Sequence, residues 1–228
     1  SSGGAFTALS DFFLKNGNAV VAAIYNYENH TTEFQMILDK DQRERAKGSK
    51  YMQSKPGGIF REAYRWLMDN SGKKMLFVGM GCQSDGFRKF SEIKEIRDRV
   101  YIVDIICHGT PPQDYLKNHI DTLEQKYKKK ADIVKFRIED ECYFTLLKKG
   151  ENKPFVSAYK DIDTYLLSFL EALTYYESCY NCKYACGERV SDITIGDFWG
   201  LGLEVPFNHP YTGAISLVLV NNKKGLNF

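Results

Sequence analysis

The sequence predicts an α/β fold, with a mixed β-sheet flanked by helices and an antiparallel strand insertion. Apolar runs typical of buried strands, at residues 20–25, 75–78 and 100–106, alternate with helix-like stretches up to about residue 125. This is the order of elements in a layered α/β domain. Three more strand patterns follow one another at 133–159 with no helix between them, and we interpret them as the insertion. The chain of 228 residues, 43% of them hydrophobic, is long enough to bury a sizeable core.

The elements of the first half follow from apolar spacing and turn residues. A helix over 6–15 carries apolar residues at helical spacing and ends at Asn16-Gly17, a C-cap signal. Strands are predicted over 20–25 and 34–38, then a polar segment, then a helix over 59–68. The strand at 75–78 runs into a glycine-rich turn, and a short helix over 87–96 precedes the strand at 100–106.

The second half continues in the same way. Pro111-Pro112 opens a helix that has its apolar residues on one face. Strands are predicted over 133–138, 143–147 and 155–159, then a helix over 164–173, and then strands over 192–195 and 215–220. No internal repeat interrupts this order, so we expect one domain over residues 1–228.

Composition and charge narrow the function classes. The formal net charge is only +2, and the one basic cluster, at 126–130, follows a helical pattern and is interpreted as a solvated helix end. We therefore expect no nucleic-acid binding.

No stretch approaches the roughly 20 apolar residues that span a membrane, and no signal peptide is recognised. We expect a cytoplasmic protein with no membrane insertion. The oligomeric state is not predicted. Because the chain starts with Ser-Ser-Gly-Gly and not with Met, we expect an excised fragment of a longer protein.

Six cysteines give the strongest chemical signal. Three of them, Cys179, Cys182 and Cys186, lie within eight residues. Cys82 and Cys107 each follow a predicted buried strand, and ligands gather beyond the carboxyl ends of strands in open α/β sheets. A Cys-x2-Cys pair with two more thiols at strand ends favours a site of four thiolates, either an iron–sulfur cluster or zinc. A redox dithiol and plain buried thiols stay open, whereas disulfides are less expected in a reduced compartment.

Other candidate positions are weaker. Ser1-Ser2-Gly3-Gly4 precedes a helix and is either a phosphate cradle or a simple N-cap. His108 follows Cys107 and is either a site residue or a structural histidine. Lys50-Tyr51 lies in a glycine-bearing segment that is expected to be solvated. The stretch Gly196-Asp197-Phe198-Trp199-Gly200 is distinctive, but it is also explained by core aromatic residues and a capped turn.

Taken together, these stretches resemble a known family. SSGGAF, GSKYMQS, GMGCQ, VDIICHGTP, CYNCKYA, RVSDITIGDFWG and GAISLVLVNNKKG stand in the order seen in the C-terminal domain of the coenzyme F-420 (deazaflavin) hydrogenase/dehydrogenase beta subunit family. The resemblance covers essentially the whole chain, and the SDITIGDFWG and CHG-P stretches carry most of it. Similar bacterial members often carry an upstream ferredoxin-like domain and often belong to polysaccharide-biosynthesis contexts.

The resemblance implies an iron–sulfur flavoprotein oxidoreductase. Its cofactors would be FAD and a 4Fe-4S cluster, with a deazaflavin coenzyme as a candidate substrate and a ferredoxin-like domain or other redox protein as partner. The cluster ligands implied are Cys82, Cys107, Cys179 and Cys182, with Cys186 as an alternate. The residues implied around the flavin are Ser2, Gly3, Gly4, Lys50, Tyr51, Gly79, Gln83, His108 and Gly109.

One position departs from the family pattern. Relatives usually have Gly-Thr-Pro-Cys where this chain has Gly79-Met80-Gly81-Cys82, which loosens the turn and removes a hydroxyl donor. The alternative interpretation is therefore a redox-silent or zinc-stabilised interaction module associated with polysaccharide biosynthesis. A thiol–disulfide oxidoreductase that uses Cys179 and Cys182 is a third interpretation.

Overall fold

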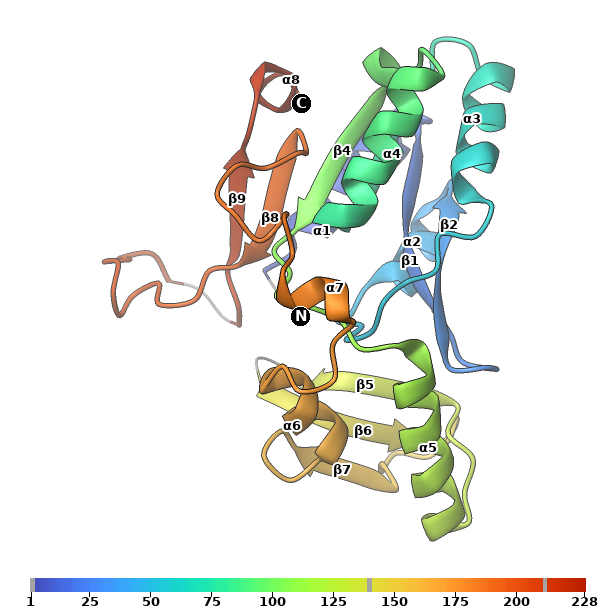
Figure 1. The fold of residues 1–228 in the computed structure, drawn as a ribbon, viewed down its shortest axis with the longest axis vertical. Helices are drawn as coiled ribbons and strands as arrows, with labels where there is room; N and C mark the ends of the chain where they lie inside the picture. The colour runs from blue at the N-terminus through green and yellow to red at the C-terminus, as the bar shows by residue number, and fades with distance from the viewer. Residues whose placement is uncertain (1–2, 139–140, 211–212) are drawn as a thin grey trace.

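The computed structural model describes residues 3–138, 141–210 and 213–228 and contains two β-sheets (Figure 1). The larger sheet has six strands in the order β2-β1-β3-β4-β8-β9. Its four central strands are parallel, and β2 and β9 pair antiparallel at the two edges. The smaller sheet is antiparallel, in the order β5-β6-β7. The predicted fold class, a mixed sheet flanked by helices with an antiparallel insertion, is confirmed.

The bounds of the elements follow the chain. The first half contains α1 (Ala5–Lys15), β1 (Ala19–Asn26), β2 (Thr31–Ile37), α2 (Lys40–Ala46), α3 (Ile59–Asp69), β3 (Met75–Met80), α4 (Gly81–Ile93), the 3-10 turn η1 (Arg97–Arg99) and β4 (Val100–Ile105). The second half contains α5 (Gln113–Tyr127), β5 (Ile133–Ile138), β6 (Glu141–Leu147), β7 (Val156–Tyr159), α6 (Thr164–Leu170), α7 (Glu177–Tyr180), β8 (Ile193–Asp197), β9 (Ser216–Val220) and α8 (Lys223–Leu226).

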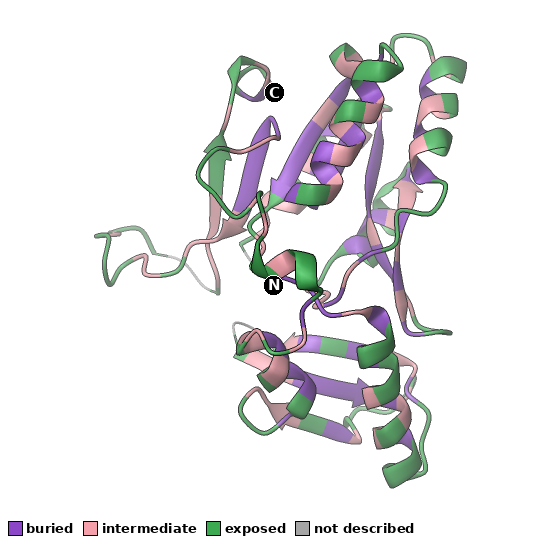
Figure 2. Cartoon of the chain, in the orientation of Figure 1, coloured by how far each residue is buried: buried purple, intermediate pink, exposed green. Residues whose placement is uncertain are grey.

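The central strands of the larger sheet are largely buried because helices cover both faces, whereas the edge strand β9 is mostly exposed (Figure 2). Successive residues of a strand point to opposite faces, and β1 shows this directly. Val21 packs in one core with residues of α3 and α4, whereas Val20 packs in a second core with residues of α1. All six residues of β3 are buried, as expected for a central parallel strand.

The insertion leaves the larger sheet after β4 and returns to it at β8. It comprises α5, the smaller sheet, α6 and α7, and it has a core of its own around Leu116, Phe144 and Leu166. Since β4 and β8 are neighbouring strands, the two ends of the insertion come back to the same part of the molecule. This topology brings residues near 107 close to residues near 180.

Several local predictions were wrong. Residues 79–83 do not form a turn, because β3 runs to Met80 and α4 begins at Gly81. The Gln83 side chain accepts a hydrogen bond from the Met80 backbone N–H (3.1 Å) and so caps this helix at once. The segment expected to be only polar contains α2, which is capped by Asp39. The short helices α7 and α8 were also missed. Among the described residues, no helix is long and apolar enough to cross a membrane.

Candidate functional site

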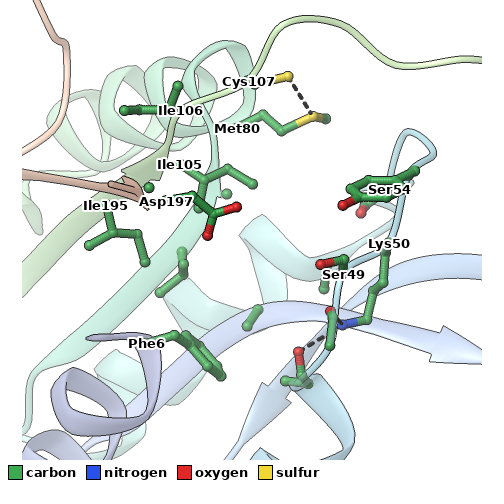
Figure 3. A pocket seen from close by; sticks show the side chains of 18 of the residues that line it. Phe6, Ser49, Lys50, Ser54, Met80, Ile105, Ile106, Cys107, Ile195 and Asp197 are labelled. Atoms are coloured by element: carbon green, nitrogen blue, oxygen red, sulfur yellow. Dashed lines mark hydrogen bonds between the residues drawn. The ribbon is translucent and has the colours of Figure 1, made fainter. Parts of the chain in front are cut away.

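A cavity of about 440 Å³ opens at the carboxyl ends of β3, β4 and β8 (Figure 3). Its size is that of a small-molecule site. Its floor is made of small residues on neighbouring strands, Ala22 and Ala23 of β1, Gly79 of β3 and Gly196 of β8. Figure 3 shows Phe6 of α1, Ile105, Ile106 and Cys107 at the end of β4, and Asp197 of β8 along the walls, with Ser49 and Lys50 opposite them.

Most of the residues implied around a flavin do line this cavity. They are Gly4, Lys50, Tyr51, Gly79, Gln83, His108 and Gly109. Gly3 is not among the lining residues. It packs against the start of β9 so closely that a β carbon would lie 2.5 Å from the Ala214 carbonyl oxygen. Ser2 lies outside the described residues.

Lys50 is a partly buried helix cap, whereas a solvated residue was expected. Its Nζ donates hydrogen bonds to the carbonyl oxygens of Ala46 (2.7 Å), Gly48 (2.9 Å) and Lys47 (3.2 Å), at the end of α2. Cations at this position satisfy the unpaired carbonyl groups of a helix end. Burial lowers the pKa of Lys50 to about 8. The loop at 47–51 is thereby held as one wall of the cavity.

His108 is held in one tautomer by its contact with Tyr175. The Tyr175 hydroxyl donates its single hydrogen to the Phe169 carbonyl oxygen (2.7 Å). Its 2.7 Å contact with His108 Nδ1 therefore requires Nδ1 to carry the hydrogen and donate it. This leaves Nε2 as an acceptor. Burial also lowers the pKa of His108, which favours the neutral ring.

The cysteines come from three separate segments. Cys82 is in the first turn of α4, Cys107 follows β4, and Cys179 and Cys182 lie in and just after α7. All six cysteines are free thiols. The Cys107 Sγ contacts Met80 Sδ at 3.7 Å and the Gly109 carbonyl oxygen at 3.8 Å. Cys107 lines the cavity, whereas Cys82 is exposed beside it.

Cys179 and Cys182 lie close enough to Cys82 and Cys107 to act on both of them electrostatically. Burial is the main cause that raises the pKa of Cys107 to about 11. The Gly109 backbone lowers this pKa, and the thiols of Cys82, Cys179 and Cys182 raise it further. Partial desolvation raises the pKa of Cys82. The Cys182 thiol raises it further, the Gln83 backbone lowers it, and the Cys179 thiol raises it. Even so, the structure in its described ranges contains no three His, Cys, Asp or Glu side chains arranged as a ready metal-binding group.

Cys186 differs from these four. It is exposed, and its Sγ makes its hydrogen bonds within its own loop, to the carbonyl oxygens of Glu188 (3.2 Å) and Lys183 (3.5 Å). Cys186 is not among the groups named as shifting the pKa of Cys82 or of Cys107. Its place as an alternate ligand stays a prediction.

Two cavity residues were missed as site residues. Asp197, in the distinctive Gly-Asp-Phe-Trp-Gly stretch, accepts a hydrogen bond from Arg137 Nη1 (2.9 Å). Both side chains line the cavity, and the Arg137 guanidinium also lies over the Trp199 ring. The unusual motif was a usable signal for Asp197. No local pattern pointed to Arg137, which arrives from β5 of the insertion.

Comparisons with known proteins agree with the fold and the motifs. The family profile for the C terminus of the coenzyme F420 hydrogenase/dehydrogenase beta subunit matches residues 72–228. A chain of the F420-reducing NiFe hydrogenase complex from Methanosarcina barkeri has a similar fold, with a TM-score of 0.65 at 16% identity. That similarity covers 99% of this chain and 70% of the other. No curated protein sequence matches significantly. The profile match extends over more than half of the sequence, and the chain therefore belongs to the coenzyme F420 hydrogenase/dehydrogenase beta subunit family, of which it contains the C-terminal region.

Proposed function

We propose that this chain is an iron–sulfur flavoprotein oxidoreductase domain that passes electrons between a hydride donor or acceptor, FAD and a 4Fe-4S cluster. The two-electron partner would be a deazaflavin-type coenzyme, and the single-electron partner a ferredoxin-like domain or another redox protein. The observation that carries the proposal is the grouping of four thiols from three chain segments beside one cavity.

The donor set fits a cluster. Four cysteine thiolates are the usual ligands of a 4Fe-4S cluster. Cys82, Cys107, Cys179 and Cys182 are free thiols, and the last two act electrostatically on the first two. Thiols lose their protons on loading, and the pKa values of Cys82 and Cys107 are raised, so uptake of the metal should be favoured by higher pH. Because the described thiols do not form a ready metal-binding group, we expect loading to draw them closer together.

The cavity fits a flavin. Its alanine and glycine lining leaves apolar space along the strands, and the positive charges of Lys47 and Arg137 on its walls suit an anionic diphosphate. A β carbon at Gly79 would be tightly placed, 3.0 Å from the Phe77 ring and 3.2 Å from the Phe34 ring.

When bound, a flavin supplies the exchange between hydride and single-electron chemistry, and a cluster supplies a one-electron carrier. The residues of the chain provide placement. Cys107 belongs both to the four thiols and to the cavity wall, so the two proposed sites share a boundary. His108 presents a fixed hydrogen-bond acceptor at this wall.

Anaerobic reconstitution tests the proposal. We expect about four iron atoms with matching sulfide per chain, together with bound FAD. Replacing Cys107 by Ala should abolish iron uptake. The matched control is Cys142→Ala, because Cys142 lies in the smaller sheet near the Tyr51 hydroxyl (3.9 Å) and should be dispensable. Equal iron loss in both variants would show that the ligand assignment is wrong. Zinc with no flavin would favour the zinc-stabilised interaction module.

A further inference from the structure

Two side chains fasten the cysteine hairpin, which we define as residues 175–189, to the rest of the molecule. The first is Arg189. Its guanidinium forms an ion pair with Asp104 through Nη2; the Asp104 side chain is buried, and that of Arg189 is 11% exposed. Its Nη1 donates to the carbonyl oxygen of Tyr184 (2.9 Å) and, over a longer distance, to that of Cys186 (3.4 Å). One planar side chain thus joins the returning end of the hairpin to β4.

Asp104 is fixed in its own position by other contacts. Its Oδ1 accepts hydrogen bonds from the hydroxyls of Ser191 (2.7 Å) and Thr194. Asn221 in turn donates to both hydroxyl oxygens, at 3.0 Å and 2.9 Å. A carboxylate with all these partners is a rigid anchor, and it lies in β4 only three residues before Cys107.

The second fastening is Tyr184, two residues after Cys182. Its hydroxyl donates to Asp85 Oδ2 (2.8 Å), and Asp85 is a buried residue of α4. The side chain also packs on Gly81, where a β carbon would lie 3.0 Å from the Tyr184 β carbon. Asp85 is three residues after Cys82 in the same helix.

The two side chains therefore end on α4, which carries Cys82, and on β4, which Cys107 follows. The leading end of the hairpin is also docked, since the Tyr176 backbone N–H donates to the Thr110 carbonyl oxygen (3.1 Å) and Tyr175 contacts His108. All of these contacts are made between groups of the chain itself.

We propose that Tyr184 and Arg189 are positioning residues that hold the cysteine hairpin against α4 and β4 and so preset the arrangement of the four thiols. The purpose of this arrangement rests on the proposed function, but the positioning is a property of the chain alone. The choice of side chains supports it. A buried ion pair is seldom better for stability than a well-packed apolar pair, whereas the guanidinium fork fixes direction as well as distance.

Hydrogen exchange on the reduced, metal-free full chain tests the positioning. The reporters are the amides of Cys179 and Ala185, which donate within the hairpin to the Tyr176 (2.8 Å) and Cys182 (3.1 Å) carbonyl oxygens. Tyr184→Phe keeps the ring and removes only the hydrogen bond to a charged group, so the exchange of these amides should become about tenfold faster. Exchange in β3 should not change. The matched control is Tyr176→Phe, since this ring is in the same hairpin and is 39% exposed.

Thiol bridging gives a second measurement that general destabilisation does not mimic. In a full chain that keeps only Cys82 and Cys182, dibromobimane becomes fluorescent when it links the two sulfur atoms. Arg189→Lys keeps a cation opposite Asp104 but loses the fork. We expect Tyr184→Phe and Arg189→Lys to lower the yield of bridged chain, and Tyr176→Phe to leave it unchanged.

The outcomes separate this proposal from the proposed function. Unchanged exchange and unchanged bridging in both Tyr184→Phe and Arg189→Lys would overturn the positioning role. If Arg189→Lys does not fold, Tyr184→Phe decides alone. If the variants behave as expected but the wild-type chain takes up no iron during anaerobic reconstitution, the positioning holds and the cluster assignment fails.

Discussion

Replacing Gly109 by Ala should destabilise this protein strongly, for two separable reasons. Gly109 has a φ of +136°, which residues with a β carbon rarely adopt. An added β carbon would also lie 2.0 Å from Cδ2 of the Tyr175 ring. That ring cannot simply turn away, because Tyr175 is buried and its hydroxyl is bonded to Phe169 and His108. Backbone strain costs about 1–3 kcal/mol, and displacement of the ring costs about 1–3 kcal/mol more.

Urea denaturation of wild-type and variant chains measures this loss in the free energy of unfolding, provided the m value is unchanged. Gly150→Ala is the matched control, because Gly150 also has a positive φ, +87°, but an added β carbon would find no atom within 4 Å. It should lose only the strain part. If Gly109→Ala costs no more than Gly150→Ala, the close packing of Tyr175 on the strand end after β4 is wrong.

Other predictions concern charge and core packing. Burial raises the pKa of Asp85, but hydrogen bonds from Lys89, Tyr184 and Arg88 outweigh it and hold this pKa at about 2. Because the folded pKa is below the unfolded value, Asp85 should contribute about 2 kcal/mol above pH 4 that is lost as the pH falls toward 2. Urea titrations at several pH values should show a flatter dependence in Asp85→Asn.

Arg97→Ala should cost about 3 kcal/mol in the free energy of unfolding, because it leaves the buried Asp192 carboxylate without its cation (Nη2–Oδ1, 2.5 Å). An unchanged urea midpoint would contradict this. Phe144→Ala, in the core of the smaller sheet, should cost about 3–5 kcal/mol. Urea denaturation of this variant should also show whether the two sheets unfold together. One transition would mean that they do, and two transitions that they unfold separately.

Local patterns determined much of the architecture. The apolar runs of β1, β3 and β4 and the helices α1 and α3 were found within a few residues of their observed bounds. Elements of this kind are specified by periodicity and turn residues close in sequence. The residue types of the candidate site were also evident in the sequence. Two cysteines in a Cys-x2-Cys pair, together with two that follow predicted strands, are an unusual chemical pattern.

The tertiary structure decided what these residues do together. Arg137 reaches the cavity only because the insertion packs beside β8, and no spacing in the sequence encodes that distance. Lys50 was expected in solvent, yet α2 offers it carbonyl groups to cap. The start of α4 at Gly81, which places Cys82 on a helix, depends on Gln83 and on its hydrogen bond to the Ser54 carbonyl oxygen (2.9 Å). Sequence patterns report contacts between neighbours in the chain, whereas the grouping of thiols from residues 82, 107, 179 and 182 depends on strand order and on the side chains that dock the cysteine hairpin.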